Sequence, residues 1–236
     1  MHNSPAATAT HEAHRNPAHL HHFATAEQQK DAASFGMWLF LVTEVMFFGG
    51  MFCAYLVYRY WYFGDFGAAS KSLAIELGAV NTAVLICSSL TVAMAVRCAQ
   101  VGKQKAMVVY LLLTIALGLA FLGIKGIEYR EKFVQHHVPG QASFHLDEHI
   151  PGHPDTPVNQ QHAQVYFSLY FAMTGMHALH MIIGVGLFAF LTYQAWKGAY
   201  SPEYYTPVEN AGLYWHFVDI VWIYLFPLLY LIDRHP

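Results

Sequence analysis

Charged side chains are scarce in this sequence. Aspartate, glutamate, lysine and arginine make up 11% of its 236 residues, whereas soluble domains carry about 25%. Hydrophobic residues account for 56% of the chain, and 16% of all residues are aromatic. This composition excludes an ordinary soluble domain and predicts a protein that lies in a membrane.

The sequence also lacks an excess of basic charge and paired cysteines. Its formal net charge is −3 with histidine neutral, so no basic patch points to a nucleic-acid partner. Cys53, Cys87 and Cys98 form no CxxC pair, and we expect no disulfide framework. The polar N-terminus has no early apolar stretch, so no cleavable signal peptide is expected there.

Residues 1–30 form a polar, histidine-rich N-terminal tail that precedes a membrane domain covering residues 31–236. Its low apolar content predicts a solvated, poorly ordered segment rather than a dedicated metal site. Six of the 16 histidines lie in this tail, namely His2, His11, His14, His19, His21 and His22.

Five apolar segments follow, and each is long enough to cross a membrane as a helix. At about 1.5 Å per residue, roughly 20 residues span a hydrocarbon core about 30 Å thick. The sequence therefore predicts an all-α integral membrane protein, built as a bundle of five transmembrane helices. The segments cover about residues 35–58, 73–96, 106–128, 165–193 and 213–232.

The first apolar segment carries two features that bear on helix packing. It contains TEVMFFGGMF, in which Gly49 and Gly50 lack side chains, so we expect a neighbouring helix to approach closely there. Aromatic residues 60–63 follow the segment. Such clusters are typical of the membrane interface.

A long loop, residues 131–162, separates the third apolar segment from the fourth. It holds four prolines and six histidines without a fixed ligand spacing, so contact with a partner or simple variability is preferred over a metal site.

Lysine and arginine number six on one side of the membrane and five on the other. This small bias favours a cytoplasmic N-terminus and a periplasmic C-terminus, with the loop in the periplasm.

Ionisable residues lie near the middle of the first and fourth segments, where burying charge in lipid is costly. Glu44 belongs to the first segment, and His177 and His180 share a helix face in the fourth. Three such ligands with an open position would resemble catalytic zinc, although a di-iron centre would need more carboxylates. Alternatively, the histidines hydrogen-bond to neighbouring helices or lipid headgroups while Glu44 stays protonated.

A second group of ionisable residues is expected closer to the membrane faces. His216 and Asp219 stand three residues apart in the early part of the last segment, and Lys125 and Glu128 end the third. These two segments run parallel in a five-helix chain, so the two pairs are expected towards opposite membrane faces. One site that uses all four side chains is therefore not expected, and each pair is either functional or a structural contact between helices.

Five motifs along the chain resemble subunit III of the haem-copper oxidases, the cytochrome c oxidase subunit III family. They occur in the family's order and cover about residues 35–231. They are TEVMFFGGMF, NTAVLICSSLTVAMA, LGLAFLGIKGIEYREKF, YFSLYFAMTGMHALHMIIG and ENAGLYWHFVDIVWIYLFPLLYL.

The resemblance implies an accessory subunit without a catalytic centre of its own. In that family, subunit III binds no haem or copper, which belong to the catalytic subunit I and the copper-binding subunit II. It binds phospholipids in a V-shaped cleft between its helices, sustains proton uptake by subunit I and protects the enzyme from inactivation during turnover. The complex takes electrons from cytochrome c, reduces oxygen to water and pumps protons across the bacterial inner membrane.

Many family members have seven helices, whereas this chain resembles the five-helix bacterial form that lacks the first two. One wall of the lipid cleft must then come from elsewhere or be absent. The resemblance assigns Glu44 to the family's buried protonatable carboxylate. It assigns a lipid-contact or interhelical hydrogen-bond role to His22, Glu128, His177, His180, His216 and Asp219.

Other assignments stay open. Subunit III of a quinol oxidase also has five helices, and an accessory protein of nitric-oxide reductase belongs to the same family. The glutamate of TEVMFF favours cytochrome c as donor, because quinol-oxidase relatives often lack it. From another class, a stand-alone membrane metalloenzyme would use Glu44, His177 and His180, but no HExxH-type motif accompanies them. A transporter is disfavoured, since no matching pair of broken helices is present.

Overall fold

The structure, a computed structural model, describes residues 25–135, 137–140, 144–146, 148–151 and 156–232. This part of the chain is helical and contains no named strand. Its elements are α1 (Ala26–Trp61), α2 (Phe63–Lys71), α3 (Ile75–Gln100), α4 (Gln104–Val134), α5 (Gln160–Trp196) and α6 (Thr206–Tyr230).

The prediction of five transmembrane helices is confirmed. Helices α1, α3, α4, α5 and α6 are each long and apolar enough to cross a membrane. Large apolar side chains such as Leu112, Leu119 and Ile183 are about half exposed on the outside of the bundle. In water this surface would aggregate, whereas in a bilayer it meets lipid.

The helices extend beyond the apolar runs that predicted them, and polar side chains cap the starts of α1 and α5. Thr25 Oγ1 accepts a hydrogen bond from the Gln28 amide at 3.1 Å at the start of α1. Helix α6 begins at Thr206, not near residue 213, with Pro207 in its first turn. Asp219 therefore lies in the middle of α6 rather than in its early part. The short helix α2 was not predicted.

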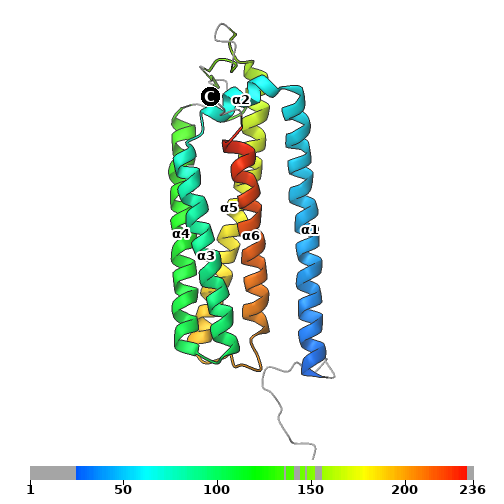
Figure 1. The fold of residues 1–236 in the computed structure, drawn as a ribbon, viewed down its shortest axis with the longest axis vertical. Coiled ribbons are helices and arrows are strands. Elements are labelled where there is room, and N and C mark those ends of the chain that lie inside the picture. The colour runs from blue at the N-terminus through cyan, green and yellow to red at the C-terminus, as the bar shows by residue number, and fades with distance from the viewer. Residues whose placement is uncertain (1–24, 136, 141–143, 147, 152–155, 233–236) are drawn as a thin grey trace, which may run out of the picture.

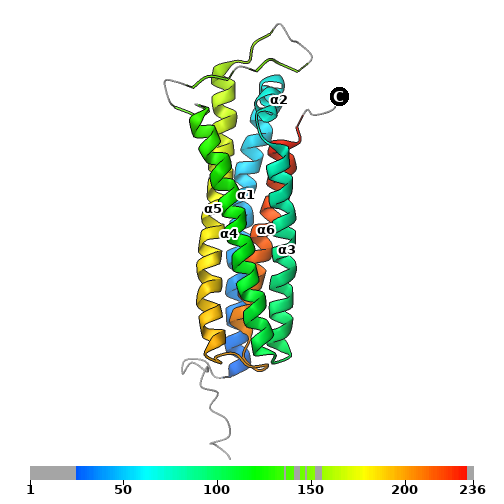
Figure 2. The ribbon, with the colours of Figure 1, turned by 90° about the vertical axis from the view of Figure 1, so that its left-hand side faces the viewer.

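Helix α6 is the central element of the bundle. It contacts α1, α2, α3 and α5, while α4 packs against α3 and α5. Among the described residues, α1 contacts only α2, α5 and α6, so it stands at one edge of the bundle (Figures 1 and 2). The start of α1, the α3–α4 turn and the α5–α6 turn share one end of the molecule, opposite α2.

The Trp215 side chain of α6 packs against α3, α4 and α5. Its indole N–H donates to Ser88 Oγ of α3 at 3.0 Å. A Cβ on Gly118 of α4 or on Gly184 of α5 would lie 2.8 or 2.9 Å from its ring. The fully buried ring thus fills the space that these two glycines leave open.

The expectation for Gly49 and Gly50 is wrong within this chain. A Cβ on either residue would meet no described atom within 4 Å. Both glycines lie on α1, which has only part of its surface against the bundle. The close helix approaches occur instead at Gly78, Gly118 and Gly184.

The end of α6 is held by tyrosine hydroxyl groups from two other helices. The last carbonyls of a helix have no N–H partner within it. Tyr55 of α1 donates to the Leu228 carbonyl and Tyr166 of α5 donates to the Leu229 carbonyl, each at 2.8 Å. These bonds satisfy groups that lipid could not satisfy, and they fix α1 and α5 to the centre of the bundle.

Substituting alanine for Gly184 should destabilise the fold. The new methyl group would lie about 3 Å from the rigid Trp215 ring, and overpacking of this kind costs about 1–3 kcal/mol. Thermal unfolding of the purified protein in detergent measures the effect as a lower Tm. Gly50→Ala is the matched control and should leave Tm unchanged or raised, because it gains helix propensity in open space. Equal Tm values for the two variants would contradict the packing described.

Candidate functional site

Glu44 of α1 and His180 of α5 form a hydrogen-bonded pair near the middle of their helices. Glu44 Oε2 lies 3.1 Å from His180 Nε2, and His180 Nδ1 lies 2.9 Å from the Met176 carbonyl oxygen. A carbonyl only accepts, so Nδ1 carries a proton. Glu44 and Nε2 then hold one further proton between them: a carboxyl donates to a neutral ring, or an imidazolium donates to a carboxylate.

His177 lies on another side of α5 and does not join this pair. Its ring packs against Phe121 of α4 at 5.4 Å and Trp222 of α6 at 5.2 Å, measured between ring centroids. The side chain is fully buried, and neither ring nitrogen has a hydrogen-bond partner among the described residues. Three residues correspond to an offset of about 60° around a helix, which is enough to direct the two histidines to different neighbours.

The metal site considered for Glu44, His177 and His180 is therefore not assembled by these side chains. Only Glu44 and His180 come together. Within the described ranges, no three His, Cys, Asp or Glu side chains cluster closely enough to hold a metal ion. His22, assigned to lipid contact by the resemblance, lies outside the described residues.

Glu128 belongs to a buried polar cluster between α4, α5 and α6. Lys125 Nζ lies 3.1 Å from Glu128 Oε2 and 2.7 Å from the Tyr230 hydroxyl oxygen. Tyr170 donates to Glu128 Oε1 at 2.7 Å, and Tyr230 donates to the same oxygen. Lys125 also lies 5.0 Å from the Trp222 ring centroid, a cation–π contact. The charges are thus neutralised inside the protein, and three helices are joined.

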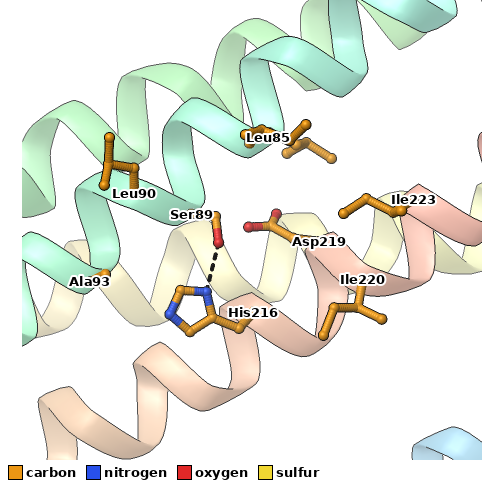
Figure 3. A pocket seen from close by; sticks show the side chains of 9 residues that line it. Leu85, Ser89, Leu90, Ala93, His216, Asp219, Ile220 and Ile223 are labelled. Atoms are coloured by element: carbon orange, nitrogen blue, oxygen red, sulfur yellow. Dashed lines mark hydrogen bonds between the residues drawn. The ribbon is translucent and has the colours of Figure 1, made fainter.

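His216 and Asp219 of α6 meet α3 at a third place, which we call the α3–α6 pocket (Figure 3). His216 Nδ1 lies 2.7 Å from Ser89 Oγ, and the Asp219 carboxyl points towards α3 beside Ser89. The pocket has a volume of about 410 Å³ and is lined by Leu85, Ile86, Ser89, Leu90, Ala93, His216, Asp219, Ile220 and Ile223.

A fourth polar contact fixes the start of α5 to α2. Asp65 Oδ2 lies 2.6 Å from His162 Nδ1, and Asp65 Oδ1 accepts from the Asn159 amide at 2.9 Å. The Tyr62 ring stacks on the His162 ring, with 3.7 Å between centroids. One end of the long loop is therefore anchored to α2 by both hydrogen bonding and stacking.

Sequence reasoning missed several members of these sites. Tyr170 and Tyr230 carried a usable signal, since each is a tyrosine inside an apolar segment that can face Lys125 or Glu128. Ser89 was equally visible as a polar residue within the second segment. The Asp65–His162 pair had no such signal, because Asp65 lies on the unpredicted helix α2 and His162 lies 97 residues away.

Removing the carboxylate of Glu128 should destabilise the bundle strongly. Glu128→Gln leaves the Lys125 ammonium without its counter-charge, and breaking a buried ion pair costs about 3–5 kcal/mol. The double variant Lys125→Met/Glu128→Gln removes both charges and should recover most of that loss. Denaturation midpoints in detergent measure both effects. A double variant less stable than Glu128→Gln would show that the cluster is not held by charge pairing.

Comparison with known proteins identifies the family of this chain. The family model for cytochrome c oxidase subunit III matches residues 16–138 and 160–233. A protein of Nocardia farcinica named probable cytochrome c oxidase subunit 3 is 32% identical over 84% of this chain and 87% of its own length. The cytochrome c oxidase subunit 3 of Thermostichus vulcanus is 28% identical, covering 89% and 92%, and that of Dugong dugon is 30% identical, covering 89% and 72%. With its five membrane-spanning helices and these matches over most of its length, this chain belongs to the cytochrome c oxidase subunit III family.

Proposed function

We propose that this chain is the accessory subunit III of a proton-pumping terminal oxidase that takes electrons from cytochrome c and reduces oxygen to water. Family membership supports a place in such an oxidase complex with other subunits. The observation that supports a role in proton uptake is the Glu44–His180 pair. In this proposal, the pair holds one exchangeable proton near the middle of the membrane, on the helix at the edge of the bundle.

The pair can hold a proton without forming a free charge in the bilayer. Because Met176 accepts the Nδ1 proton, the other ring nitrogen is directed at Glu44. Shifting the proton between Oε2 and Nε2 converts a neutral pair into an ion pair, and both forms keep the hydrogen bond. The two side chains are 18% and 12% exposed, so a neighbouring subunit or a water chain can reach them.

In this proposal, the chain supports proton uptake by subunit I rather than conducting electrons. Haem and copper supply the redox chemistry when bound in the partner subunits I and II. The contribution of this chain is a protonatable side-chain pair and an apolar surface beside the catalytic subunit. We place it in the inner membrane of a bacterium, with its N-terminus in the cytoplasm and its C-terminus in the periplasm.

Phospholipid binding is the second part of the proposal. Much of α1 is free of contact with other helices, and it presents large apolar side chains such as Val45 and Met46, which are 58% and 74% exposed. Acyl chains would cover this surface in the bilayer. The α1 edge would thereby form one wall of a lipid site, with the other wall supplied by a second subunit.

The variant Glu44→Gln tests the role of the exchangeable proton. Glutamine can still donate a hydrogen bond to His180 Nε2, but it has no titratable carboxyl group. Packing is therefore kept and proton exchange is lost. We expect an assembled oxidase with an unchanged haem spectrum and initial rate, which loses activity in fewer turnovers than the wild type. Oxygen consumption by the purified oxidase, followed until its activity ceases, measures both the initial rate and the number of turnovers before inactivation.

Glu76→Gln is the matched control, because it removes an exposed carboxylate in the first turn of α3. This control should behave as the wild type in both quantities. Loss of the haem spectrum in Glu44→Gln would instead make Glu44 a structural or ligating residue. If Glu44→Gln stays active for as many turnovers as the wild type, the Glu44–His180 pair has no part in the proposed function.

A further inference from the structure

Two aromatic rings pack against His180, the histidine of the Glu44–His180 pair. The Tyr214 ring of α6 lies nearly parallel to the imidazole, with 6.4 Å between centroids and 27° between the two planes. The Phe48 ring of α1 lies 5.4 Å from the imidazole centroid at a steep angle. Both aromatic side chains are buried. Because the interior is closely packed, the imidazole has little room to turn away from Glu44.

Tyr214 contacts His180 through its hydroxyl group as well as through its ring. The hydroxyl donates a hydrogen bond to the His180 carbonyl oxygen at 2.8 Å. A Cβ on Gly184 would lie 3.1 Å from the Tyr214 ring, so α5 passes close to this side chain. One residue of α6 thus contacts both the backbone and the imidazole of His180. The Met176 carbonyl accepts from Nδ1, which leaves Nε2 directed at Glu44.

Tyr214 also contacts α1, the helix that carries Glu44. Its ring lies 6.0 Å from the Phe40 ring, measured between centroids. Phe40, Glu44 and Phe48 follow one another at intervals of four residues, so they share one face of α1. Tyr214 contacts the first of these residues, and His180 contacts the other two. The position of α1 relative to α5 at this depth therefore depends on a side chain of α6.

The hydrogen bond between Glu44 and His180 depends on the geometry that these contacts maintain. A hydrogen bond weakens steeply as its donor–acceptor distance lengthens or its angle bends. Two opposite charges in apolar surroundings also need good geometry to offset the cost of leaving water. A side chain that fixes both partners therefore determines how firmly the pair holds its proton.

We propose that Tyr214 is a positioning residue for the Glu44–His180 pair. Its hydroxyl bond to the His180 carbonyl, together with its ring contacts to α1 and α5, holds the two side chains at hydrogen-bonding distance. Tyr214 acts through His180 and takes no proton itself. This inference rests on the proposed function, since the pair matters to the oxidase only if it exchanges a proton there.

The variant Tyr214→Phe tests this role, because it removes the hydroxyl bond and keeps the aromatic ring. The probe is dicyclohexylcarbodiimide, a lipid-soluble reagent that adds to protonated carboxyl groups, applied to the assembled oxidase in its native membrane. We expect Glu44 to be labelled about twofold to tenfold faster than in the wild type, the range that the loss of one hydrogen bond produces. A carboxyl group released from His180 is free to react. Peptide mass spectrometry measures the labelling of this residue.

Tyr166→Phe is the matched control. Tyr166 is also a buried tyrosine whose hydroxyl donates to a backbone carbonyl at 2.8 Å, but that carbonyl belongs to Leu229 at the end of α6. Glu44 should be labelled at the wild-type rate in this variant. Equal acceleration in both variants would show a general loosening of the bundle and would overturn the inference. A wild-type rate of labelling in Tyr214→Phe would also overturn it.

Turnover of the same variants separates this inference from the proposed function. Tyr214→Phe should lose activity in fewer turnovers than the wild type, as Glu44→Gln should. Early inactivation of Glu44→Gln together with wild-type labelling in Tyr214→Phe would overturn the inference alone. Faster labelling in Tyr214→Phe, with a wild-type number of turnovers in both variants, would overturn the proposed function and leave the positioning contact in place.

Discussion

The structure depends on one constraint, which is that hydrocarbon offers no hydrogen-bond partner to a polar group. The cluster of Lys125, Glu128, Tyr170 and Tyr230 shows how the chain meets it, because each charged or hydroxyl group bonds to another inside the bundle. The same rule explains why tyrosine hydroxyls satisfy the final carbonyls of α6. Polar bonds between helices therefore set where α4, α5 and α6 meet, and apolar packing around Trp215 fills the rest.

A few buried polar groups are exceptions, because they have no hydrogen-bond partner within the bundle. Among the residues that the structure describes, Asn81 and His177 carry buried polar groups without hydrogen-bond partners within the bundle. The His177 ring packs between the rings of Phe121 and Trp222, so this side chain is part of the packed interior of the bundle. Asp219 lines the α3–α6 pocket, where its carboxyl lies beside Ser89. Glu44, by contrast, is paired but partly exposed, which suits a group that exchanges a proton.

Much of the fold could be predicted from the sequence, because lipid imposes a simple requirement of about 20 apolar residues per helix. Composition does not reveal where helices end, since Thr25 and Pro207 set those limits outside the apolar runs. It also does not reveal which face of a helix meets which neighbour. Gly49 and Gly50 therefore looked like contact sites, although the close approaches occur at Gly118 and Gly184. Glu44 and His180 were recognisable as a group, but the direction of His177 depended on tertiary packing.

Purification from the native membrane tests most directly the proposal that this chain works as a cofactor-free accessory subunit. The chain would be isolated in mild detergent, and the optical spectrum, metal content and co-purifying subunits would be determined. The account predicts a haem spectrum that belongs to a large haem-copper subunit, with a two-copper domain in a second subunit that indicates cytochrome c as electron donor. Isolation of the chain alone, colourless and with stoichiometric metal, would contradict it.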